Sequence, residues 1–178
     1  MTENLNAGRS IRTISGQYVN VFEPNPDTLL ISDIAHALSN QCRFGGHLPR
    51  FYSVAQHSLL CYSIANEDEK YDALMHDASE AYLLDFPKPI KMEIAQYNEI
   101  EHKLMLVLAE KFNFNYPKSS EVERVDIHLL KWEWESIMLD GINKLYPPID
   151  CMTPLEAKTE FLRTFEHEVA KRKLLQTV

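Results

Sequence analysis

The sequence predicts an all-α fold, a helical bundle with a short extended N-terminal arm or hairpin. It contains only 5 glycines and 9 prolines, and most of the prolines are clustered. Long periodic segments therefore have few internal breaks, which favours helices. Apolar residues make up 45% of the 178 positions, as in a globular protein with its own core. Because no internal repeat or low-complexity segment occurs, we expect one domain spanning residues 1–178.

The N-terminal segment contains the extended element. In SGQYVNVFEPNP, aromatic and β-branched residues stand at Tyr18, Val19, Val21 and Phe22, and two prolines follow them. Such side chains favour strands, and proline ends them. We expect a short hairpin or arm here.

The segments that follow predict helices. In DTLLISDIAHALSN the apolar residues Leu30, Ile34 and Leu38 have helical spacing, and the glycines of CRFGGHLPR end the helix in a loop. Further helices are expected at about residues 53–66, 70–83, 95–113, 119–140 and 154–174. The segments DFPKPI, NFNYPKS and GINKLYPPIDCMTP separate the last four.

The net charge indicates which partners the whole chain could attract, and the cysteines indicate its compartment. Eighteen basic and 26 acidic residues give a net charge of −8, so nothing attracts the whole chain to nucleic acid or to an anionic membrane. No apolar run approaches the roughly 18 to 20 residues that span a bilayer. The three cysteines are odd in number, lack paired metal-type spacing and follow no secretory leader. We therefore expect a cytoplasmic protein without disulfides.

Four titratable residues lie close together in YDALMHDASEAYLLDFPKPIK. They are His76, Asp77, Glu80 and Asp85. A His-Asp dipeptide alone is weak evidence, because chance gives one in roughly one sequence of three at this composition. The pair needs partners from elsewhere in the chain.

Two such partners occur on other predicted helices. His57 lies in the apolar segment FYSVAQHSLL, and Asp126 lies among apolar residues in VERVDIHLLKW. Alone, His57 could be a hydrogen-bonded core residue and Asp126 a surface residue. Together with His76 and Asp77 they offer imidazole nitrogen and carboxylate oxygen from three helices, a set that suits a divalent transition metal in a bundle core.

These residues carry a family resemblance. His57, His76-Asp77 and Asp126 follow the H…HD…D pattern of the HD-domain metal-dependent phosphohydrolases. The longer segments CRFGG, RFYSVAQHS, HDASEAYLLDFPKPIK and RVD resemble the small 5'-deoxynucleotidase branch, over roughly residues 15–140. In addition, GQYVNVFEPNP and ISDIAHALSNQCRF are similar to phage-borne members, which include dATP triphosphohydrolases.

The resemblance implies roles for individual residues. His57, His76, Asp77 and Asp126 would ligate one metal, Glu80 would be the catalytic acid/base, and Asp85 would lie near the sugar. The position of Glu80, four residues after His76 on a predicted helix, places both on one face. A metal also lowers the pKa of a bound water towards neutrality, so no strong side-chain base is needed.

Substrate contacts are expected from cationic and aromatic side chains. Arg43 matches the Arg of the family's Arg-Trp pair, but Phe44 stands where Trp is common. Phe44 could still stack on a base, in a pocket that includes Pro89. The phosphate-binding candidates are Arg43, Lys88, Lys91 and Arg124. We expect the prolines of DFPKPI to hold Lys88 and Lys91 on an extended loop.

The sequence therefore predicts a metal-dependent enzyme acting on a small-molecule deoxynucleotide, in the host cytoplasm if the protein is phage-encoded. The resemblance favours hydrolysis of dATP to deoxyadenosine and triphosphate. Two alternatives stay open: a 5'-deoxynucleotidase that releases phosphate from monophosphates, and a non-catalytic nucleotide-binding module. Zn, Co, Mn, Fe or Ni would suit the ligands, and Mg could accompany a triphosphate. A homo-oligomer, a dimer or hexamer, is expected, with the helix around Trp132, Trp134 and Ile137 at the interface.

Overall fold

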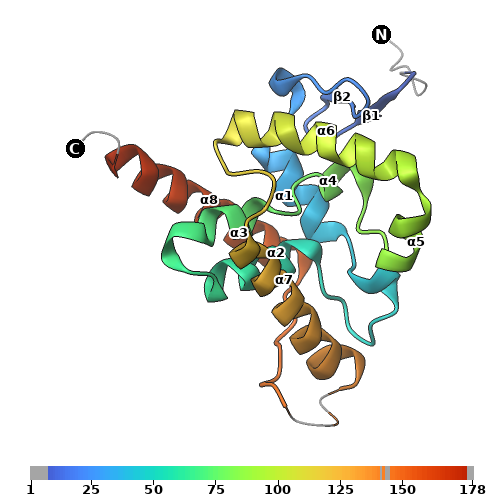
Figure 1. The fold of residues 1–178 in the computed structure, drawn as a ribbon, viewed down its shortest axis with the longest axis vertical. Coiled ribbons are helices and arrows are strands. Elements are labelled where there is room, and N and C mark those ends of the chain that lie inside the picture. Colours follow the sequence, from blue (N-terminus) through green and yellow to red (C-terminus); the bar gives the residue numbers. More distant parts are fainter. Residues whose placement is uncertain (1–7, 141, 143–144, 176–178) are drawn as a thin grey trace.

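A computed structural model of the protein describes residues 8–140, 142 and 145–175. It confirms the all-α fold with a short N-terminal hairpin (Figure 1). In the hairpin, β1 (Ser10–Arg12) pairs antiparallel with β2 (Tyr18–Asn20). Val19 is fully buried, so the hairpin packs one face against the helices. The connection predicted after residue 140 lies partly outside the described residues.

The helices fall close to the predicted segments. They are α1 (Ile31–Asn40), α2 (Val54–Ile64), α3 (Lys70–Met75), α4 (Glu80–Leu83), α5 (Lys88–Glu93), α6 (Ala95–Phe112), α7 (Ser120–Glu133) and α8 (Pro154–Leu175). Serine caps begin two of them: Ser53 accepts a hydrogen bond from the Gln56 amide, and Ser119 from the Val122 amide. These caps satisfy amides that have no partner within the helix.

Helix α2 lies at the centre of the bundle, in contact with α1, α3, α7 and α8. Seven of its eleven residues are buried, and a helix without a broad polar face belongs in an interior. Polar side chains on α2 must therefore find partners inside the protein. His57 is one of them.

The main apolar core lies among α1, α2, α3, α6 and α8. Its fully buried members include Ile34, Leu38, Leu104, Leu108 and Phe161. A smaller apolar cluster, which includes Val122, Val125 and Leu129, fixes α7 against α2 and α3. These clusters hold in place the elements that carry the predicted site.

The helix predicted at 70–83 is interrupted. Residues 76–79 form turns between α3 and α4, in which the Ala78 amide bonds to the Met75 carbonyl and the Glu80 amide to the Asp77 carbonyl. The expectation that His76 and Glu80 share one continuous helix face was therefore wrong. The break allows His76 and Asp77 to turn towards α2 and α7 while Glu80 begins a separate short helix.

The extended loop predicted for DFPKPI was also wrong. Lys88 and Lys91 lie on α5, whose second residue is Pro89. Proline is well tolerated there because the first amides of a helix have no internal partner, and its fixed φ suits a helix. The prolines thus start a short helix and do not keep the segment extended.

The helix predicted at about 119–140 is present, but its last part takes another helical form. The backbone continues as a π-helical segment over Trp134–Met138. Ile137 is fully buried and belongs to a cluster with Leu48, Tyr52 and Ile149, so it serves the protein's own core and not a subunit interface.

Among the described residues, no helix combines the length and apolar character that crossing a bilayer requires.

Candidate metal centre

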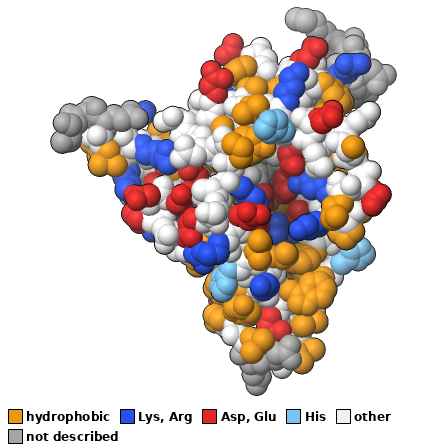
Figure 2. Space-filling view, viewed as in Figure 1, with side chains coloured by type: hydrophobic (Ala, Val, Ile, Leu, Met, Phe, Trp, Pro, Cys, Tyr) orange, Lys and Arg blue, Asp and Glu red, His pale blue; other side chains and the backbone are white. Residues whose placement is uncertain are grey.

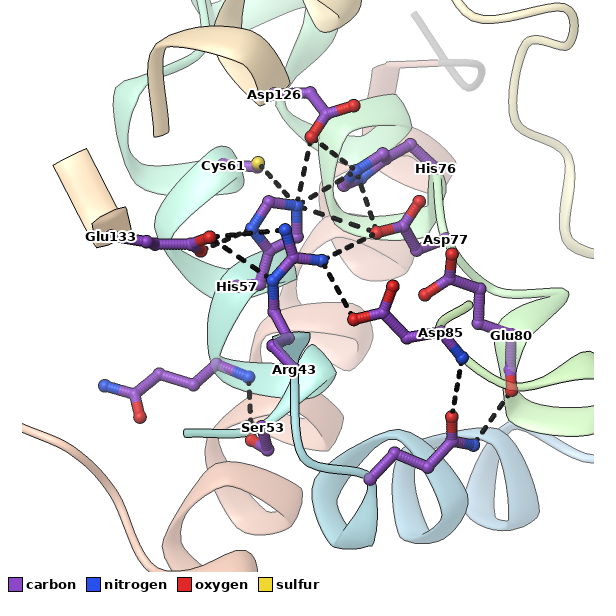
Figure 3. A network of polar contacts seen from close by, with 12 residues as sticks. Arg43, Ser53, His57, Cys61, His76, Asp77, Glu80, Asp85, Asp126 and Glu133 are labelled. Atoms are coloured by element: carbon purple, nitrogen blue, oxygen red, sulfur yellow. Dashed lines mark hydrogen bonds and ion pairs between the residues drawn. The ribbon is translucent and has the colours of Figure 1, made fainter. Parts of the chain in front are cut away.

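The four predicted ligands come together from three parts of the chain (Figure 3). His57 comes from α2, His76 and Asp77 from the turn after α3, and Asp126 from α7. We call these four residues the ligand set. Nε2 of His57 lies 3.3 Å from Nε2 of His76, 3.3 Å from Oδ1 of Asp126 and 3.6 Å from Oδ2 of Asp77. Nε2 of His76 lies 3.2 Å from the same Asp77 oxygen.

Both imidazoles are oriented by their other nitrogen. Nδ1 of His76 lies 2.7 Å from the Ala73 carbonyl, which can only accept, so this nitrogen is the donor. Nδ1 of His57 lies 2.6 Å from Oε1 of Glu133. Such bonds to the second nitrogen fix the tautomer of a metal-binding histidine and leave the Nε2 lone pair facing the metal.

The spacing of the donors fits a small cation. Two ligand atoms about 2.1 Å from one ion at a tetrahedral angle are about 3.4 Å apart. The closest separations in the ligand set, 3.2 and 3.3 Å, match this value. Two imidazole lone pairs and two carboxylate oxygens that face one point repel each other unless a positive charge lies between them. The residues present therefore fit a divalent metal.

The pKa shifts in the ligand set also indicate that this site favours a positive charge. The pKa of His57 is raised well above its ordinary value: burial and the charge of Arg43 oppose protonation, but the acidic groups Cys61, Glu133 and Asp126 outweigh them. Burial raises the pKa of Asp77 and of Asp126, yet the two histidines hold both well below the usual range. Without metal, the acidic groups around His57 therefore favour its protonated form.

A cysteine lies beside the ligand set. One ligand atom from each of His57, Cys61 and His76 lies within 4.8 Å of the other two. Sγ of the fully buried Cys61 is 3.6 Å from Nε2 of His57, one helical turn earlier on α2. The structure thus offers a possible metal-binding group that includes a thiol, which the cysteine spacing alone did not predict. The signal was its position four residues after a predicted ligand.

Glu133 supports the ligand set from behind, and sequence reasoning missed it. This glutamate is fully buried at the end of α7. Besides His57, its carboxylate accepts a 2.7 Å bond from the Tyr52 hydroxyl and bonds of 3.2 and 3.3 Å from Arg43. Burial raises the pKa of Glu133, but the charges of His57 and Arg43 have the larger effect, so the pKa lies below its ordinary value. It therefore stays ionised and holds the imidazole in place.

Arg43 contacts Glu133 on one side and approaches the carboxylates of Asp77 and Asp85 on the other. One terminal nitrogen binds Glu133, and the other lies 3.6 Å from Asp85 and 3.9 Å from Asp77. These two distances exceed a normal hydrogen bond. The second nitrogen is therefore able to donate to an oxygen placed between the carboxylates. Arg43 itself is only 7% exposed.

Glu80 lies beside the ligand set with an unusual environment. It is 5% exposed, and among the described residues its Oε2 has no hydrogen-bond partner. Its pKa is raised well above the ordinary value, because burial and the charges of Asp77 and Asp85 disfavour the ionised form. Lys91 opposes this effect from 3.5 Å. Raised carboxyl pKa values of this kind suit a general acid.

Gln41 fixes the backbone around Glu80. Its side-chain amide donates to the Glu80 carbonyl at 2.8 Å, and its oxygen accepts from the Asp85 amide at 3.3 Å. Because α4 is only one turn long, this contact from the end of α1 is important for its position. The role of Gln41 was not predicted, because nothing in the sequence around it distinguishes it from an ordinary loop residue.

The remaining predicted substrate contacts lie further out. Phe44 packs near Trp134, with ring centroids 6.2 Å apart, and lines a separate apolar pocket. Lys88 and Pro89 are exposed on α5 and, unlike Lys91, do not line the pocket beside the ligand set. The structure pairs Arg124 with Glu121 at the surface of α7. Stacking of Phe44 on a base stays a prediction, and Arg124 has no contact with the site.

Comparison with known proteins finds relatives of the chain. It is 42% identical over 130 residues to the uncharacterized protein YfdR of Escherichia coli K12, which covers 73% of each chain. It is 35% identical over 111 residues, 57% of each chain, to the uncharacterized protein RCAP_rcc00048 of Rhodobacter capsulatus. No family model matches. The chain therefore belongs to the same family as YfdR.

Proposed function

We propose that the protein is a metal-dependent phosphohydrolase that cleaves deoxynucleotides at the α-phosphate. One observation carries the proposal: two histidine nitrogens and two aspartate oxygens converge beside a buried glutamate, and their nitrogen–nitrogen and nitrogen–oxygen separations are 3.2 to 3.9 Å. These are the positions that the HD-domain resemblance assigns to the metal and to the acid/base. The resemblance further favours dATP as substrate, with deoxyadenosine and triphosphate as products.

The metal would be held by the ligand set and supported by Glu133. When bound, a divalent ion there polarises a phosphoryl oxygen and makes water a better nucleophile. Zn, Co, Mn, Fe and Ni all accept such ligands. The protein's own groups would then bind the substrate and move protons.

Glu80 is the group suited to move a proton. Its raised pKa keeps the carboxyl neutral over more of the pH range, so it has a proton to give to the departing 5' oxygen. Lys91, 3.5 Å away, would stabilise the carboxylate that this transfer leaves behind. In the same reaction, the second terminal nitrogen of Arg43 would hold a phosphoryl oxygen, and Asp85 would accept a hydrogen bond from the sugar.

Product analysis tests the proposal. Metal-reconstituted protein and a Glu80→Ala variant are incubated separately with each deoxynucleoside triphosphate and monophosphate, and the products are separated by chromatography. We expect deoxyadenosine and triphosphate from dATP, and no product with the variant. Nucleoside and phosphate from monophosphates alone would identify a 5'-deoxynucleotidase. No turnover with metal demonstrably bound would favour a non-catalytic nucleotide-binding module.

We also propose a homo-oligomer, a dimer or hexamer. Leu130 and Trp134 lie at the exposed end of α7 and after it, at 42% and 49% exposure, and exposed apolar side chains that line one pocket suit a subunit contact. Light scattering after size-exclusion chromatography measures the mass directly. A monomer at all concentrations would contradict this assignment.

A further inference from the structure

The cysteine beside the ligand set belongs to two groups of side chains at once. Cys61 is fully buried on α2 and packs in the smaller apolar cluster with Val122 and Val125. A buried free cysteine usually behaves as a small apolar side chain, so packing alone would explain its burial. Packing does not explain the direction of its sulfur, which faces Nε2 of His57 at 3.6 Å (Figure 3). That nitrogen is also the one that faces Asp77 and Asp126.

The separations of the sulfur from both histidines fit binding to one ion. A sulfur about 2.3 Å and a nitrogen about 2.1 Å from one zinc, at a tetrahedral angle, are about 3.6 Å apart. This is the distance found between Cys61 and His57. One ligand atom of His76 lies within 4.8 Å of both, whereas a sulfur and a nitrogen on opposite sides of an ion are about 4.4 Å apart. A shift of a few tenths of an ångström is therefore enough to bring all three onto one ion.

The thiol reaches the ligand set from the interior of the bundle. The pocket beside the ligand set is lined by residues that include His76, Asp77 and Lys118, and Cys61 does not line it. Figure 2 shows acidic and basic side chains gathered around a hollow near the middle of this face. A sulfur ligand on the buried side would leave the pocket side free for water or substrate. Catalytic metal sites need such an open position.

A nearby cation offsets the additional negative charge of a thiolate. Two aspartates and a thiolate would place three negative charges around one divalent ion. Nζ of Lys118 lies 2.7 Å from Oδ2 of Asp126, and Oδ1 of the same carboxylate lies 3.3 Å from Nε2 of His57. The lysine thus holds a positive charge on the far side of one expected ligand. The metal, the lysine and the three anionic ligands would together be neutral.

We propose that Cys61 supplies a thiolate to the metal, and that this sulfur makes the site select Zn²⁺ or Co²⁺ over Mn²⁺ and Mg²⁺. Thiolate is a soft ligand that suits zinc, whereas carboxylate and water suit magnesium and manganese. When the metal binds, the S–H bond breaks, a sulfur–metal bond forms and the proton passes to solvent. The inference rests on the metal dependence in the proposed function, but not on the substrate. The H…HD…D pattern contains no cysteine, so the resemblance does not supply this ligand.

X-ray absorption at the zinc edge tests the sulfur ligand on the wild-type chain. With one equivalent of Zn²⁺ bound, we expect one sulfur at about 2.3 Å, together with nitrogen and oxygen ligands at about 2.0 to 2.2 Å. Protein loaded with Co²⁺ should also show the strong near-ultraviolet absorption of sulfur-to-cobalt charge transfer. Cys61→Ser should lose this absorption. Cys151→Ser, which removes a partly buried thiol outside the ligand set, is the control and should keep it. Zinc bound by nitrogen and oxygen alone would overturn the proposal.

Metal selectivity supplies a second readout. Competition with a chromophoric chelator gives the affinities of wild type, Cys61→Ser and Cys151→Ser for Zn²⁺ and for Mn²⁺. Cys61→Ser should bind Zn²⁺ about tenfold or more weakly, since loss of even an outer partner of a metal ligand costs this much. Its affinity for Mn²⁺ should stay close to that of wild type. Equal losses for both metals would overturn the selectivity, because Cys61 would then only pack. Circular dichroism establishes that the variants are folded.

The two proposals fail in different ways. If sulfur binds the metal but no deoxynucleotide is hydrolysed, the role of Cys61 stands and the proposed hydrolysis fails. If deoxynucleotides are hydrolysed while the metal has nitrogen and oxygen ligands alone, the proposed function stands and the role of Cys61 fails. Should Cys61→Ser not fold, the X-ray absorption of the wild-type protein decides the question by itself.

Discussion

Two regions that pack against α2 are built on opposite principles. Towards α1 and α8, the helix meets fully buried apolar side chains such as Ile34, Leu38 and Phe161. Towards α3 and α7, beside the smaller apolar cluster, it presents His57 to a buried set of charged groups that includes Glu133 and Arg43. One helix thus joins the apolar core to the polar site.

The comparison indicates that the apolar core stabilises the fold and that the polar site carries the reactive groups. Burial of apolar surface stabilises the fold directly. Burial of charges has a large desolvation cost, which pairing offsets only when the geometry is good. In the polar region each buried charge has a partner, but Oε2 of Glu80 has none among the described residues. We therefore expect substitutions in the two regions to have separable effects.

The largest effect should come from Glu80→Gln, in the rate of the proposed hydrolysis. Removal of a general acid typically lowers a rate by about 100- to 10,000-fold. Metal content and the midpoint of thermal unfolding should stay close to wild type, because Gln keeps the shape of the side chain. Steady-state kinetics on dATP with metal at saturation measure the loss. Glu93→Gln, exposed on α5, is the control; equal loss in both variants would contradict the role of Glu80.

Phe161→Ala should cause the largest loss of stability. Phe161 on α8 is fully buried in the main core, and truncation of a buried phenylalanine costs about 3 to 5 kcal/mol. Urea unfolding monitored by circular dichroism measures this cost. Leu155→Ala, at a position 73% exposed on the same helix, should change stability by about 0.5 kcal/mol or less. The two regions would not be separable if the folded Phe161 variant lost metal affinity.

Glu133→Gln should weaken metal binding by about 10- to 100-fold, the usual consequence of losing a carboxylate behind a metal-binding histidine. The substitution keeps the volume but removes the charge that His57 and Arg43 contact. Competition with a chromophoric chelator measures the affinity for Zn²⁺. Glu123→Gln, exposed on the same helix, should bind as wild type does. Wild-type affinity in the Glu133 variant would show that His57 needs no such support.

The fold, and the convergence of His57, His76, Asp77 and Asp126, could be predicted because each leaves a recognisable pattern in the sequence. Helical periodicity determined the long helices, and the spacing of His57, His76-Asp77 and Asp126 matched a known pattern. The break at residues 76–79 was not predictable from periodicity, because alanines and Glu80 are good helix formers. The tertiary contacts of His76 and Asp77 with His57 and Asp126 outweigh that local preference.

Glu133 shows what closer reading of the pattern could have found. Val122, Val125 and Leu129 form the buried stripe of α7, and Glu133 continues it four residues later. A charged residue on a buried stripe needs a partner inside the protein, which in this case comes from residues about 80 to 90 positions earlier in the chain. Sequence spacing could flag this glutamate, but not identify its partners.

The smallest effect concerns stability against pH in the metal-free protein. Because burial raises the pKa of Glu80, the folded state retains this proton to higher pH than the unfolded chain does. Its contribution to stability is complete below the unfolded-state pKa and is lost as the pH rises through the folded-state pKa. Glu80→Gln has no such proton, so its free energy of unfolding relative to wild type should increase with rising pH. Urea unfolding of both proteins after chelation, at a series of pH values, measures the difference. A difference that is constant with pH would show that Glu80 ionises as freely in the folded protein as in the unfolded chain.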